Sequence, residues 1–315
     1  MARHALRRVL LAIAQLTLLS VLVFLLTSLL PGDAADVLFN DKTGTEQIAR
    51  LRHEMGLDQP PAQRFLDWAK NLLTGDAGTS LTGGQPVSGI VAHSVGATAL
   101  LAGVTAVIAV PVALVLGLVT GCRAGGRLDR TVTAVTLALG SVPDFVLSLA
   151  LVAVFALKLG WLPSTWIGAT TGDLLTRPGL LVLPVAVLLA RTVSQLIRQF
   201  RAGTLGALNS GYAQQARRLG VPRTRLLLRH VLPNAAVPGV QQLARTGDAL
   251  LGGVLVVEAV FAVPGAATAL IEAVRSRDVP TVQALTLLLA AAALFLNVAA
   301  DLVSHRLSPR VEVLR

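Results

Sequence analysis

Six apolar segments, each long enough to cross a bilayer, constrain this chain more than any other feature. They lie at residues 9–30, 96–121, 131–157, 180–196, 234–257 and 281–303. A transmembrane helix needs about 20 predominantly apolar residues. The composition agrees, because only 14% of the 315 residues are charged and the mean hydropathy is +0.70, whereas soluble domains have about 25% charged residues. We therefore expect an all-α polytopic membrane protein with six transmembrane helices.

The first apolar segment has two interpretations, a cleaved signal peptide or a permanent helix. It is longer than the apolar core of a typical signal peptide, and Pro31-Gly32-Asp33 stands where small residues would mark a cleavage site. We expect a permanent helix, so that residues 1–30 form an N-terminus and a first span.

Arginine is unevenly distributed among the loops. The N-terminus, the 122–130 loop, the 197–230 loop and the tail at 306–315 are arginine-rich, and six spans place all four on one side. By the positive-inside rule this side is cytoplasmic. The net charge of +10 therefore indicates membrane orientation. Nucleic-acid binding is not expected, since aromatic residues for stacking on bases make up only 4% of the chain.

Residues 31–95 are of a different kind, with more acidic than basic residues. Thr43 and Glu46 form a capping box for one short helix, and Pro61 suits the first turn of a second. The predicted apolar side of that second helix holds Phe65, Trp68, Leu72 and Leu73. A turn-rich loop follows at residues 75–84. We expect a small extracytoplasmic domain here, and a core with five further helices at 96–305.

The arginine-rich stretch at residues 191–230 contains no acidic residue. One apolar stripe with helical spacing comprises Leu205, Leu208, Tyr212, Ala216 and Leu219. Gly220 is expected to end this helix, and Pro222 to begin another that buries Leu226, Leu227 and Val231. Two interpretations stay open at this point, namely a docking surface for a partner and interfacial helices that rest on anionic lipid.

Three ionisable residues lie inside the expected spans. Asp144 is near the middle of the third, and Arg245 and Asp248 share one face of the fifth. Such groups are costly in a bilayer and usually face a cavity or a partner. One interpretation is a structural Arg245–Asp248 pair beside a neutral Asp144. The other is a solute path, in which Asp144 meets an amino group and Arg245 meets a carboxylate.

Motifs of common enzymes are absent from the sequence. It contains no GxxxxGK[ST] phosphate loop, no HExxH and no GxSxG. Cys122 is the single cysteine, which excludes an intrachain disulfide and any multi-cysteine metal site. We expect no enzymatic activity, no cofactor and no metal in this chain.

A series of short motifs resembles the permeases of the dipeptide, oligopeptide and nickel branch of ABC importers. In that family an "EAA" loop docks on a cytoplasmic ATPase, and Ala216 and Gly220 match its pattern. Gln214 and Gln215 replace the Glu and the Ala of the pattern. Ser308 also departs from the family pattern, which has an Asp before the last Pro-Arg. The similar stretches are LPGD at 30–33, GLDQP at 56–60, GDAGTS at 75–80, LGWLP at 159–163, YAQQARRLG at 212–220, LRHVLPNA at 228–235, VEAVF at 257–261 and SRD at 276–278.

The resemblance implies a type I importer permease fold in the bacterial cytoplasmic membrane, with a coupling loop at 205–230. Its candidate docking residues are Tyr212, Ala213, Gln215, Ala216, Arg217, Leu219 and Gly220. The implied partners are a C-type permease in a heterodimer, two ABC ATPase subunits and an extracytoplasmic solute-binding protein. We expect import of short peptides by alternating access, because no His- or Cys-rich path favours a metal. Nickel or haem import, and a proton-coupled secondary transporter, are the alternatives.

Overall fold

The computed structural model describes residues 2–29, 53, 58–168 and 172–307. The expected capping box at Thr43 and Glu46, the motif at 30–33 and Ser308 lie outside the described residues. The side chains of Arg245 and Asp248 also lie outside them, although the backbone there belongs to a helix. The elements of the described chain are helices, and one isolated β-bridge pairs Thr79 with Pro86.

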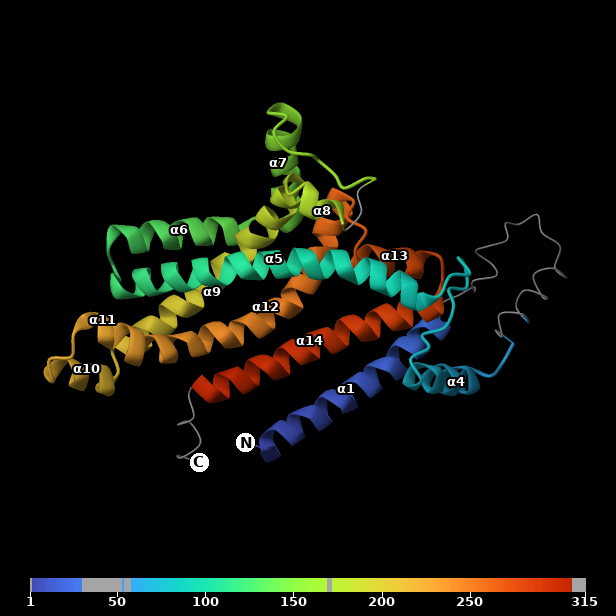
Figure 1. Ribbon diagram of the computed structural model, residues 1–315, viewed down its shortest axis with the longest axis horizontal. Helices are drawn as coiled ribbons and strands as arrows, with labels where there is room; N and C mark the ends of the chain where they lie inside the picture. Colours follow the sequence, from blue (N-terminus) through green and yellow to red (C-terminus); the bar gives the residue numbers. More distant parts are fainter. Residues whose placement is uncertain (1, 30–52, 54–57, 169–171, 308–315) are drawn as a thin grey trace. The chain divides into compact units, whose positions relative to one another are not determined.

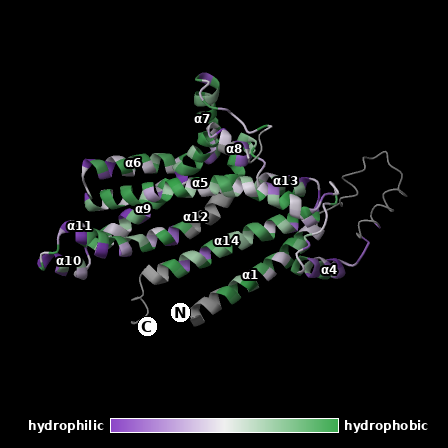
Figure 2. Ribbon diagram, viewed as in Figure 1, coloured by the Kyte–Doolittle hydropathy of each residue, from purple (hydrophilic) through white to green (hydrophobic). Residues whose placement is uncertain are grey.

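Long apolar helices dominate the described chain (Figure 1). Four are long and apolar enough to cross a membrane: α1 (Ala2–Leu29), α5 (Val87–Cys122), α9 (Gly179–Leu208) and α14 (Val279–Leu307). Hydrophobic residues cover most of their length in Figure 2. Two broken helix pairs raise the number to six if each is one span. The expectation of an all-α polytopic protein is confirmed, and α5, α9 and α14 are longer than the apolar segments that predicted them.

The third expected span is broken. Residues 131–157 were expected to form one helix, but α6 (Arg127–Ser141) and α7 (Asp144–Leu151) are separate, and the chain bends by 98° between them. Pro143 has no N–H to donate, and it forces Val142 into an extended conformation with ψ of 126°. A π-helix, η1 (Val152–Lys158), continues α7. The expectation of one continuous helix was therefore wrong, because the Val-Pro pair ends a helix here, although the two helices together are apolar enough to form one bent span.

The fifth expected span lies within α12 (Leu232–Phe261), which ends at Ala262 in a left-handed conformation with φ of 52°. The segment after it was expected to be a loop, but residues 266–275 form helix α13 (Ala266–Arg275). Its buried alanines, Ala266, Ala267 and Ala273, lie on the one side that packs. Of the charged residues expected in that loop, Glu258 lies in α12, and Glu272 and Arg275 lie near the end of α13.

The chain divides into two compact units. One comprises Met1–Thr98 and Pro264–Ala292, and the other Ala99–Val263 and Ala293–Arg315. In the first unit, Val23 of α1 packs with Ala273 and Val282. Helix α4 (Pro61–Leu73) begins at Pro61 as expected, and the ring of Phe65 meets Phe24 edge-on, with centroids 5.2 Å apart. Leu72 and Leu73 are exposed, so only part of its predicted apolar side is covered in this chain.

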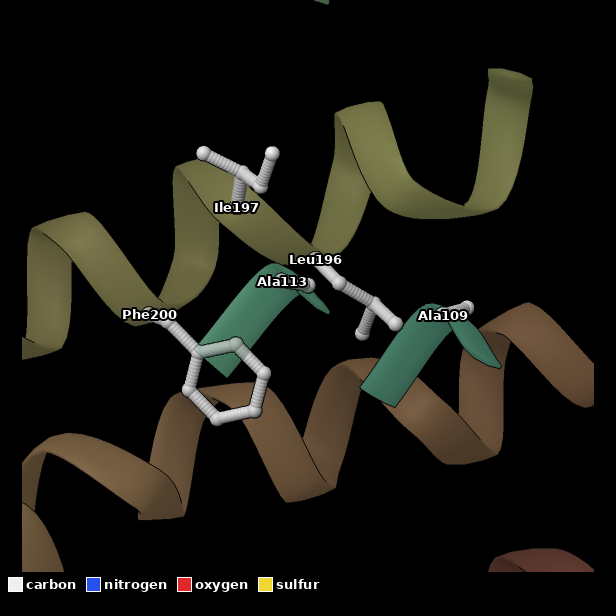
Figure 3. Packing of buried hydrophobic residues seen from close by; sticks show 5 residues of the cluster. All are labelled: Ala109, Ala113, Leu196, Ile197 and Phe200. Atoms are coloured by element: carbon white, nitrogen blue, oxygen red, sulfur yellow. The ribbon is translucent and has the colours of Figure 1, made fainter. Parts of the chain in front are cut away.

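In the second unit, α5, α9 and α12 pack closely around small residues. Phe200 of α9 lies among Ala109 and Ala113 of α5 and Leu196 and Ile197 of its own helix (Figure 3). The ring of Phe200 also covers Gly239 of α12, where an added Cβ would lie 2.1 Å from the ring. Small residues at such crossings let helix backbones approach in a membrane, where dispersion replaces the hydrophobic effect. This packing fixes α9, and with it the segment that follows.

Candidate coupling site and ion pairs

The arginine-rich segment after α9 folds into a helical hairpin. Helix α9 ends at Leu208, and α10 (Gly211–Arg218) begins after a turn. The Ser210 hydroxyl donates to the Ala207 carbonyl over 2.6 Å, and the Gln214 side chain donates to the Asn209 carbonyl over 3.2 Å. The single helix expected from Leu205 to Leu219 was therefore wrong. Asn209, Ser210 and Gly211 are turn-forming residues, and their sequence could have predicted the break.

Gly220 ends α10 as expected. Its φ is +73°, which glycine adopts without steric cost. The N–H of Val221 donates to the Ala216 carbonyl and the N–H of Gly220 to the Arg217 carbonyl. These two bonds define a Schellman motif, and the accompanying apolar contact joins Val221 and Ala216 within one cluster. The turn after α10 is thus held by backbone and side chain together.

One face of α10 is buried and the other is open. Ala213 is fully buried in a cluster with Ala207, Leu226, Val231 and Ala235, and Ala216 packs against it. The remaining candidate residues, Tyr212, Gln215, Arg217, Leu219 and Gly220, are exposed. The Leu219 side chain is 73% exposed. Because water would otherwise surround such an apolar side chain, this face suits a partner.

The hairpin continues directly into α12. Pro222 precedes α11 (Arg223–Leu226), a π-helical turn η2 (Leu227–Val231) follows, and α12 begins at Leu232. Leu226 and Val231 are buried and Leu227 packs against them, as the sequence predicted. Helix α10 is therefore anchored at both ends to long helices of its unit, α9 and α12.

An ion pair that the sequence analysis missed fixes the same end of the unit. Arg201 of α9 binds Asp129 of α6, with Nε 2.6 Å from Oδ1. The backbone N–H of Gly125 donates to the other carboxylate oxygen over 2.9 Å. Asp129 is the one acidic residue in the arginine-rich 122–130 loop, and this isolated acid could have predicted an ion pair.

Asp144 is the first residue of α7, and it is paired. Its Oδ2 accepts a hydrogen bond from Nη1 of Arg191 in α9 over 2.9 Å. A Cβ added at Gly253 of α12 would lie 3.2 Å from the same oxygen, so α12 passes close to the pair. The expected partners of the solute path, Arg245 and Asp248, belong to α12, but their side chains are outside the description. Sequence reasoning had placed Arg191 at the start of the arginine-rich stretch, whereas it lies within α9.

Asp278, in the first unit, joins two of the stretches that resemble importer permeases, residues 75–80 and 276–278. Its buried carboxylate accepts hydrogen bonds from the Ser80 hydroxyl, the Leu81 N–H at 3.1 Å and the Thr281 hydroxyl at 2.7 Å. The loop at 78–86 is thereby attached to the start of α14. Elsewhere in the described residues, His, Cys, Asp and Glu form no group of three that could hold a metal ion.

Comparison with known proteins agrees with this architecture. Residues 113–313 match the family described as binding-protein-dependent transport system inner membrane component, and residues 1–98 match the N-terminal region of such membrane components. A putative peptide transport system permease of Brucella abortus (strain 2308) is 33% identical over 306 residues, or 97% of this chain and 98% of its own length.

Two further relatives align over nearly all of both chains. A probable peptide ABC transporter permease of Sinorhizobium fredii is 30% identical over 313 residues, covering 99% of each chain. The glutathione transport system permease of Salmonella choleraesuis is 32% identical over 311 residues, again covering 99% of each. The resemblance to importer permeases is confirmed, and the protein is a multi-pass protein of the bacterial inner membrane. The chain belongs to the family of binding-protein-dependent transport system inner membrane components, the permease subunits of ABC importers.

Proposed function

We propose that this chain is the B-type permease subunit of an ATP-driven importer of short peptides. The near-complete alignment with permeases named for peptide and glutathione transport carries the proposal. Glutathione is a tripeptide, so these names favour short peptides over nickel or haem. Membership in a binding-protein-dependent family also disfavours proton-coupled secondary transport.

In the proposed topology both termini and the hairpin around α10 are cytoplasmic, and residues 31–95 are extracytoplasmic. The arginine-rich loops support this orientation. A C-type permease completes the translocation pathway as a heterodimer, two ATPase subunits bind from the cytoplasm, and a solute-binding protein delivers peptides from outside. Membership in the family implies ATPase subunits, a binding protein and a second permease, and we propose the subunit type and the stoichiometry in addition.

Helix α10 is the proposed coupling helix, with Tyr212, Gln215 and Leu219 toward the ATPase. Its buried Ala213 and partly buried Ala216 hold it to the ends of α9 and α12. A displacement of α10 by the ATPase would thus act on two spans at once. ATP can bias the two access states only if these contacts differ in free energy between them.

The proposed solute path contains Asp144, Arg245 and Asp248, and Arg191 joins it through its contact with Asp144. The Arg191 side chain is 49% exposed in this chain, whereas that of Asp144 is 11% exposed. The guanidinium therefore keeps donors for a peptide carboxylate while its pairing with Asp144 holds it in place.

Replacement of Gly220 by alanine tests the coupling role. A left-handed conformation costs about 1 kcal/mol for a residue with a Cβ, which makes formation of this turn about fivefold less favourable. ATP-driven uptake of dipeptides by the reconstituted complex should therefore fall. Gly84→Ala is the matched control, because Gly84 also has a positive φ of 65° and open space around an added Cβ. Both variants should be compared with wild type for uptake and for co-purification of the ATPase subunits.

Three results would contradict parts of the proposal. Uptake that continues without ATP but stops with a proton uncoupler would favour a secondary transporter. Equal uptake by the Gly220→Ala variant and wild type would remove the coupling role from this turn. Uptake of nickel or haem in place of peptides would refute the substrate alone.

A further inference from the structure

Two adjoining hollows open beside α10, where α5 ends. One has a volume of about 340 Å³ and lies between the last turn of α5 and the run from α11 to α12. The other has a volume of about 460 Å³ and reaches the end of α9 and α10. Cys122, Arg223 and Leu227 line both. We call the two together the Cys122 groove.

The groove has basic and apolar parts but no acidic lining residue. Arg123, Arg217 and Arg223 come from three different segments, and none forms an ion pair with a described residue. The rest of the lining is leucine and valine, apart from Cys122. Leu118 lies one helical turn before Cys122, about 6 Å further along α5 toward the apolar span. The arginines therefore lie at the end of the groove nearest the proposed cytoplasm.

This distribution favours one class of occupant. A soluble anion would pair with the arginines but leave the leucine walls uncovered. An apolar protein segment would cover the walls but desolvate three guanidinium groups without a counter-charge, which is costly. An anionic phospholipid satisfies both parts, with a phosphate for the arginines and an acyl chain for the leucines. Basic clusters at the cytoplasmic ends of spans are known to attract anionic lipids.

We propose that the Cys122 groove binds an anionic phospholipid of the cytoplasmic leaflet. Its phosphate contacts Arg123, Arg217 and Arg223, and one acyl chain lies along Leu118 and Leu227. The inference rests on the cytoplasmic position of α10 in the proposed function. A lipid bound here contacts α5, α10 and α11 together, and so it supports the coupling helix.

Cys122 provides a direct reporter, because it is the only cysteine of the chain and lines both hollows. The permease complex, purified with its partner subunits, is placed in nanodiscs of phosphatidylcholine with or without phosphatidylglycerol of the same acyl chains. The rate of maleimide alkylation is then measured by mass on the peptide that contains Cys122. Phosphatidylglycerol should slow alkylation of wild type.

Arg123→Gln and Arg223→Gln should each weaken this protection about fivefold, because each arginine near an anionic lipid surface strengthens binding by about that factor. The double variant should lose the protection. Arg225→Gln is the matched control, because Arg225 is exposed on the same short helix but lines neither hollow. It should be protected like wild type. Size-exclusion profiles and retained ATPase subunits establish that each variant is assembled.

Four results would overturn the inference. Alkylation could be equally fast in both kinds of nanodisc, or protection could survive in the double variant. Soluble glycerol phosphate could protect Cys122 in phosphatidylcholine nanodiscs, which would identify a site for a soluble anion. The fourth is protection in phosphatidylcholine that requires only the ATPase subunits, which would mean that protein covers the groove. Peptide uptake is a separate readout, so lipid binding without uptake refutes the proposed function alone.

Discussion

The guanidinium of Arg201 binds the carboxylate of Asp129 at two points, with Nε 2.6 Å from Oδ1 and Nη2 2.9 Å from Oδ2. Asp129 lies in the first turn of α6, and Arg201 lies about two turns before the end of α9. The pair therefore connects the turn after α5 to the part of α9 that leads into α10. Two-point pairs of this kind fix orientation as well as distance.

Loss of Asp129 should destabilise the permease. In Asp129→Ala the guanidinium of Arg201 stays partly buried without its counter-charge. We expect this to lower the free energy of unfolding by about 2 kcal/mol. This value is below the range for fully buried pairs, because the Arg201 side chain is 31% exposed. The melting temperature of the complex in detergent measures this. Arg201→Lys keeps the charge but loses the two-point geometry and should cost less. Asp67→Ala, at an exposed position of α4, should be neutral, and a neutral Asp129→Ala would contradict the prediction.

A methyl group at Gly239 should separate α9 from α12. Its Cβ would lie 2.1 Å from Cε1 of Phe200, well inside van der Waals contact. Overpacking of this kind typically costs about 1–3 kcal/mol, so Gly239→Ala should lower the melting temperature and the yield of assembled complex. Gly206→Ala is the control, because Gly206 is helical and has open space; it should be neutral or slightly stabilising. Phe200→Leu should partly rescue Gly239→Ala, and failure of that rescue would place the strain elsewhere.

Asp278 should determine whether the 78–86 loop is ordered. Asp278→Asn replaces one acceptor oxygen by an NH2 group, which faces donors from Ser80, Leu81 and Thr281. We expect hydrogen exchange of the Leu81 amide to accelerate at least tenfold, since loss of a bond to a buried charge costs about 1.5–3 kcal/mol. Asp76→Asn is the control, because Asp76 is exposed and accepts a hydrogen bond from the Gly78 N–H within its own loop. Unchanged exchange at Leu81 would show that the loop is held without Asp278.

Helix positions in this protein could be predicted from the sequence because apolar length is a local property. Local signals also gave the end of α10 at Gly220 and the start of α4 at Pro61. The break at Pro143 was underestimated, because a proline in a membrane helix can be tolerated when neighbours satisfy the freed backbone groups. Whether they do so depends on packing that the sequence does not display.

The ion pairs and the hydrogen bond between Ser80 and Asp278 could not be predicted in the same way. Asp144 and Arg191 are 47 residues apart, Asp129 and Arg201 are 72 apart, and Ser80 and Asp278 are 198 apart. Local spacing instead suggested Arg245 and Asp248 as a pair, because they share a helix face. Only the packing of α6 and α7 against α9 brings the distant partners together, so charge and depth could nominate Asp144 but could not name its partner.

The pair of Asp144 and Arg191 offers a test that separates stability from transport. Arg191→Gln should destabilise more than Asp144→Asn, because it leaves the more buried partner, Asp144, without a counter-charge. The double variant replaces the ion pair by two amides that can hydrogen-bond, and its stability should recover, with a coupling energy of about 2 kcal/mol in a double-mutant cycle. Arg198→Gln, exposed on the same helix, is the control.

Peptide uptake by the same variants should follow charge rather than stability. If Asp144 and Arg191 contact the termini of the peptide, the double variant will be assembled and stable but will import dipeptides poorly, because both charged groups are gone. The uptake rate of a dipeptide amide, which lacks the carboxylate, should then differ little between wild type and Arg191→Gln. The uptake rate of the free dipeptide should be much lower in Arg191→Gln than in wild type. Full uptake of free dipeptides by the double variant would show that the pair only joins α7 to α9, and the solute path would have to be sought at other residues of the spans.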